Sequence, residues 1–82
     1  MKTIKVKTCL TYLDHTGKLK NLSFELSTKN VKTLFNNLVY DAMILANNLK
    51  GEIKIQQTAK SLYISYLDVP GTNKIDQYYE TV

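Results

Sequence analysis

The residues that could carry out covalent or acid–base chemistry are few and far apart in this sequence. The chain of 82 residues has one histidine, His15, one cysteine, Cys9, and seven carboxylates that share no motif. Nucleophilic and acid–base catalysis each need at least two such groups within reach of one another. The sequence therefore predicts a protein that is not an enzyme and has no catalytic residues.

Metal and cofactor sites are not expected either. One histidine and one cysteine cannot provide the spacing of a metal site, and the three glycines stand singly, at turns and caps, so they form no phosphate-binding loop. We interpret His15 as a solvated turn residue and Cys9 as a partly covered structural thiol. For both residues, a structural role is therefore a better interpretation than a catalytic or metal-binding role.

The elements that hold these residues follow from the hydrophobic pattern. Residues 4–13 and 22–26 alternate apolar and polar side chains on either side of an Asp-His-Thr-Gly turn, which predicts a β-hairpin. Residues 53–56 and 62–66 repeat this pattern and predict a second hairpin, ended by Pro70-Gly71. Between them, an apolar stripe at helical spacing, with Asn30 among the candidate N-caps and Gly51 as the C-terminal cap, predicts an amphipathic helix over residues 29–50.

These elements predict an α+β fold of order ββαββ. We expect a four-stranded, mostly antiparallel sheet with the helix packed on one face, and both hairpins contributing apolar side chains to a single core. The expected domain covers residues 1–70. Residues 71–82 form an expected tail, in which Ile75, Tyr78 and Tyr79 fit one helical turn docking back onto the domain, or else a disordered terminus.

The helix surface opposite the core supplies the leading functional hypothesis. Tyr40 and Ile44, four residues apart, form a small apolar ridge flanked by asparagines, and a solvated helix face normally carries Lys and Glu instead. We expect a protein-binding module that associates with itself, as a homodimer, or binds or inhibits a larger protein. An asparagine-rich composition would explain the same surface equally well. The expected interface residues are Tyr40, Ile44, Asn36, Asn37, Asn47 and Asn48.

Basic charge supplies the alternative hypothesis. The net charge is +4, and residues 1–32 hold seven lysines and only two carboxylates. Lysine can contact phosphates nonspecifically, but the chain has no arginine, the usual reader of guanine edges. The alternative is a nucleic-acid-binding accessory protein whose contacts would be Lys5, Lys7, Lys18, Lys20, Lys54 and Tyr63.

The amino-terminal residues alternate lysine with apolar residues, which is unlike the apolar core of a signal peptide. The longest uncharged run is far shorter than the roughly 20 residues that span a bilayer. We therefore expect a cytoplasmic protein with no membrane contact, in a setting such as a phage or mobile-element accessory protein.

Overall fold

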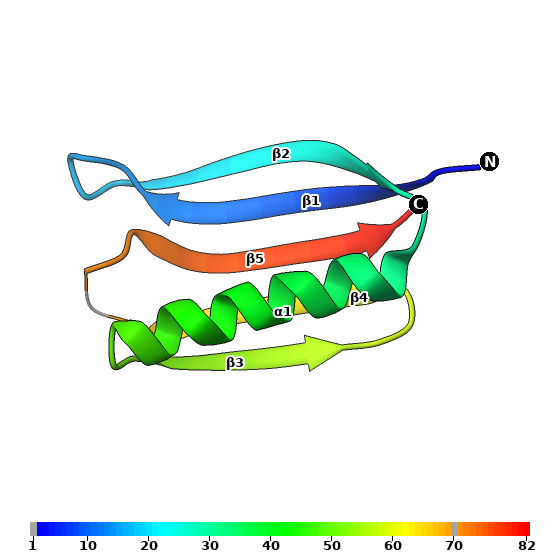
Figure 1. Ribbon diagram of the computed structural model, residues 1–82. Helices are drawn as coiled ribbons and strands as arrows, with labels where there is room; N and C mark the ends of the chain where they lie inside the picture. Colours follow the sequence, from blue (N-terminus) through cyan, green and yellow to red (C-terminus); the bar gives the residue numbers. More distant parts are fainter. Residues whose placement is uncertain (1, 70) are drawn as a thin grey trace.

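A computed structural model describes residues 2–69 and 71–82 as a sheet with one helix on one face (Figure 1). All neighbouring strands are antiparallel, and the sheet has five strands in the order β2-β1-β5-β4-β3. The elements are β1 (Ile4–Leu13), β2 (Leu19–Thr28), α1 (Val31–Asn48), β3 (Glu52–Gln57), β4 (Ser61–Asp68) and β5 (Lys74–Thr81).

The α+β class and the helix on one face of an antiparallel sheet are confirmed, but the prediction of four strands was wrong. The expected tail forms β5, which lies at the centre of the sheet between β1 and β4. Tyr78 and Tyr79 point to opposite faces of this strand, so their helix-like spacing from Ile75 was misleading. Pairing with two neighbours, which no local pattern reveals, decides the conformation of this segment. Pro70, predicted to end the second hairpin, lies outside the described residues.

A tight turn joins β1 to β2. The Asp14 carboxylate accepts hydrogen bonds from the backbone N–H of Thr16 at 2.8 Å, from the Thr16 hydroxyl at 2.6 Å and from the backbone N–H of Lys18 at 3.0 Å. Gly17 has φ of 83°, a value that glycine adopts without strain. These contacts hold the turn, and β1 and β2 then pair over ten residues without a register shift.

The helix begins and ends with defined caps, inside the predicted range of 29–50. The Asn30 side chain accepts a hydrogen bond from the Thr33 N–H at 3.1 Å, as an N-cap does. At the other end the left-handed residue is Lys50, with φ of 55°, and not Gly51. Gly51 N–H donates to the Ala46 carbonyl at 2.8 Å, which completes a Schellman motif with lysine in the usual glycine position.

The core lies between α1 and the half of the sheet formed by β3, β4 and β5, with part of β1. Phe35 on the helix packs over Tyr79 of the central strand, and both side chains are buried. Both hairpins contribute to this core, as expected, but β2 contributes little: Val6 of β1 is buried in it, whereas Leu26 of β2 is only partly buried against it. The buried apolar residues are Val6, Phe35, Ala42, Ala46, Leu62, Ile64, Tyr66, Val69 and Tyr79.

Candidate protein-binding surface

The helix-side face of the first hairpin is only partly covered. Thr8, which is buried, lies opposite Phe24, and Leu10 lies opposite Leu22, so all four side chains share the face on which α1 packs. Leu22 is nevertheless 48% exposed and Phe24 is 39% exposed. We call Leu10, Leu22 and Phe24 the hairpin platform.

The widths of the elements explain why this platform is open. Strands lie about 4.8 Å apart, and a helix with its side chains is about 10 Å across. One helix therefore covers roughly two strands, and α1 lies over the β3–β4 side of the sheet (Figure 1). The helix-side face of β2 is therefore left open at Leu22 and Phe24, whereas Val6 and Thr8 of β1 are buried.

A groove lies between α1 and strands β4 and β5 of the sheet. Leu38, Asp41 and Leu45 line it from the helix, and Tyr66, Lys74 and Gln77 line it from the sheet. The Tyr66 hydroxyl donates to Gln77 Oε1 at 3.2 Å, and the Lys74 ammonium lies 6.0 Å from the centroid of the Tyr66 ring. The groove thus offers apolar contacts with one carboxylate and one ammonium at its sides.

The residues predicted on the helix ridge lie on the solvent side of α1, but they do not all face one surface. Tyr40 is 65% exposed and Ile44 is 41% exposed. Ile44 and Asn48 line the groove beside the sheet, where the exposed Asp41 lies as well. The helix surface therefore carries a charge, Asp41, which the prediction did not take into account. Asn36, Asn37 and Asn47 are also exposed.

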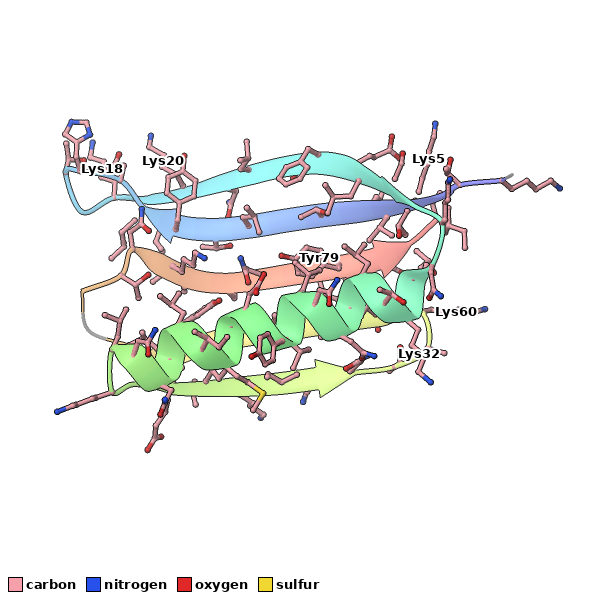
Figure 2. The ribbon with its side chains drawn as sticks, in the orientation of Figure 1. Lys5, Lys18, Lys20, Lys32, Lys60 and Tyr79 are labelled. Atoms are coloured by element: carbon pink, nitrogen blue, oxygen red, sulfur yellow. The ribbon has the colours of Figure 1, made fainter. Side chains whose placement is uncertain are left out.

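The lysines of the nucleic-acid hypothesis are divided among separate places. Lys5, Lys7 and Lys54 share the outer face of the sheet, whereas Lys20 pairs with Tyr12 on the helix side and Lys18 lies next to the turn. Figure 2 shows Lys18 and Lys20 at one end of the hairpin and Lys5 at the other. At 3.3 Å per residue, the seven positions from Tyr12 to Lys5 correspond to about 23 Å. The sheet does not gather these residues into one patch.

The outer face of the sheet is mixed in charge. Register places Lys7 between Glu25 of β2 and Glu80 of β5, both directly opposite it. Tyr63, the aromatic residue predicted here, makes an edge-to-face pair with Tyr78, with ring centroids 6.3 Å apart and ring planes at 66°. The Tyr78 hydroxyl donates to Glu80 Oε2 at 3.2 Å. A surface with carboxylates between its lysines attracts phosphates weakly.

Comparison with protein-family models, with curated proteins and with solved structures gives no match.

The residues considered for chemistry are placed far from one another. His15 is exposed in the β1–β2 turn, as interpreted from the sequence. Cys9, interpreted as partly covered, is instead exposed on the outer face, with its Sγ 3.5 Å from Ser23 Oγ. Within residues 2–69 and 71–82, no group of three or more His, Cys, Asp or Glu side chains is arranged to hold a metal ion. No helix in the same part of the chain is long and apolar enough to cross a membrane.

Sequence reasoning missed the hairpin platform, because Leu22 and Phe24 alternate with polar residues as core residues do. Their pattern identifies the face that is apolar, but it does not show whether anything covers that face. Comparing the number of predicted helices with the number of predicted hairpins would have indicated the open surface, because one helix cannot cover both hairpins.

Proposed function

We propose that this chain is a non-enzymatic protein-binding module that works in the cytoplasm. Its hairpin platform binds an amphipathic helix of a protein partner. One observation carries the proposal: Leu22 and Phe24 are exposed on the face of the sheet on which α1 packs. Exposed apolar surface next to a groove is typical of protein interaction sites. An accessory protein of a phage or mobile element would fit such a role.

The shape and chemistry of this face favour a helix as the occupant. A second helix lying beside α1 would complete the usual two-layer packing of helices on a sheet. Its apolar stripe would cover Leu10, Leu22 and Phe24, and its flanks would meet Ile44 and Asn48 of the helix ridge, which line the groove. Asp41 and Lys74 would offer one charged contact of each sign at the rim.

The test compares two tagged variants in a nuclease-treated cell extract. We expect the wild-type protein and Tyr63→Ser, which changes the outer face, to retain the same protein. Phe24→Ser should lose it, because the platform loses its largest side chain. A photoreactive residue at position 22 should then cross-link to a helix of the retained protein. Equal retention by Phe24→Ser would contradict the proposal.

A further inference from the structure

The edge of β2 is unusually open. β2 has ten residues, contains no proline, and pairs with β1 without a register shift. The other edge strand, β3, has six residues and a register irregularity between Glu52 and Ile53. Short length, bulges, prolines and charged side chains protect sheet edges from pairing with another chain. β3 is short and has a register irregularity, whereas β2 has neither, and its only charged residues are Lys20 and Glu25.

The hydrogen-bonding groups on this edge can be assigned. Asp14 N–H donates to the Lys18 carbonyl at 2.9 Å, which makes these two residues a hydrogen-bonded pair. Hydrogen-bonded and non-bonded pairs alternate along an antiparallel ladder. The even-numbered residues of β2 therefore direct their N–H and C=O groups to β1, and the odd-numbered ones direct theirs to the open edge. The outward residues of β2 are Leu19, Asn21, Ser23, Glu25 and Ser27.

From this edge we propose that two copies of the chain pair through β2, antiparallel, about a twofold axis at Phe24. A twofold axis perpendicular to the sheet keeps both helices on the same face, so residues of equal parity lie opposite one another. In this register Phe24 lies opposite Phe24 of the partner subunit. Leu22 lies opposite Leu26 of the partner subunit, so each apolar residue in the centre of the strand meets another.

The charges of β2 are compatible with this register. The only charged residues of β2 are Lys20 and Glu25. They lie opposite Thr28 of the partner subunit and Ser23 of the partner subunit, so no like charges are directly opposed. An axis at Ser23 would instead place Lys20 opposite Leu26 of the partner subunit. An axis at Leu22 would place it opposite Phe24 of the partner subunit.

The pairing would join two sheets of five strands into one continuous sheet. Asn21, Ser23, Glu25 and Ser27 of each copy would gain backbone hydrogen-bond partners in place of water. The two hairpin platforms would also form one continuous apolar surface between the two helices. The inference rests on the edge of the sheet and not on its face, so it can fail independently of the proposed function.

The first test is the mass of the protein in solution, by sedimentation over a range of concentrations. We expect the wild-type protein and Ser23→Ala to be dimers, and Ser23→Pro to be a monomer. Proline at an outward position removes no hydrogen bond to β1 but blocks the edge, and circular dichroism checks that the variant is folded. A wild-type protein that stays monomeric at its highest soluble concentration, or a Ser23→Pro dimer, would overturn the inference.

Two further measurements do not depend on the proline variant. In the wild-type dimer, the amides of Asn21, Ser23, Glu25 and Ser27 should exchange slowly with solvent, and free exchange would contradict the pairing. In a Cys9→Ser background, Phe24→Cys should form a disulfide-linked dimer on oxidation. Leu22→Cys, the matched control, should not, because only position 24 meets itself across the axis at the roughly 4.5 Å of a non-bonded pair.

The outcomes separate this inference from the proposed function. Ser23→Pro leaves Leu22 and Phe24 in place, so a monomeric variant that still retains another protein supports both. A wild-type monomer that retains another protein overturns the inference and supports the function. A dimer that Ser23→Pro disrupts, with no other protein retained, supports the inference and contradicts the function.

Discussion

Phe35 packs on Tyr79 in the centre of the core, with ring centroids 6.5 Å apart and ring planes inclined at 49°. Tyr79 is only 3% exposed, and burial raises the pKa of its hydroxyl to about 12, from a usual value of 10.0. The folded protein therefore resists ionisation of this hydroxyl more than the unfolded chain does.

This difference predicts a loss of stability at alkaline pH. Below pH 10 Tyr79 is neutral in both states. Between pH 10 and about 12 only the unfolded chain releases the proton, so the free energy of unfolding falls as pH rises, by up to about 1.4 kcal/mol per pH unit. Tyr79→Phe should make this decline shallower. Urea unfolding of both proteins at pH 9 and pH 11 measures the difference, and parallel declines would show the expectation to be wrong.

Lys50→Gly should stabilise the protein. Lys50 holds φ of 55° at the end of α1, a conformation that costs a residue with a Cβ about 1 to 2 kcal/mol relative to glycine. Part of this gain is offset because glycine is more flexible in the unfolded chain, so we expect a net gain of about 0.5 to 1 kcal/mol. Thermal unfolding of the variant measures it. Lys54→Gly, in the middle of β3, is the control that should destabilise the protein.

Asp14→Ala should weaken the first hairpin in a pH-dependent way. Three hydrogen bonds to the carboxylate, the strongest from the Thr16 side chain, hold the pKa of Asp14 below its usual value of 3.8. A lowered pKa contributes stability above pH 3.8 that is lost as pH falls through the folded value. The variant should therefore be less stable than the wild-type protein at pH 7, and the gap should narrow toward pH 2. Urea midpoints at the two pH values test this, and a constant gap would contradict it.

Nucleic-acid binding should be weak. Lys7 lies between Glu25 and Glu80, and Lys20 lies on the other face of the sheet from Lys5. We expect a fluorescent single-stranded oligonucleotide to show at most slight anisotropy change at low salt, lost on adding salt. Tight binding that Lys7→Gln weakens would favour the nucleic-acid alternative over a protein partner.

Much of the fold follows from local pattern, and the part that does not depends on long-range pairing. Alternation located β1, β2, β3 and β4, and helical spacing with Asn30 as a candidate cap located α1. β5 was missed because Asp76 and Gln77 interrupt its apolar pattern, and its partners lie far away in the sequence. The candidate surface was missed for a related reason. Whether Phe24 is covered depends on where α1 lies, which the residues of β2 do not encode.

The central position of β5 has a consequence for how the molecule assembles. The first hairpin and the β3–β4 hairpin can each form from neighbours in the chain, but the two halves of the sheet meet only through β5, which follows both in sequence. Insertion of this strand between β1 and β4 is a non-local step, and such steps slow folding. Until β5 inserts, each hairpin has two unpaired edge strands. Pairing of β5 with β1 and β4 removes one open edge from each hairpin and joins them into one sheet.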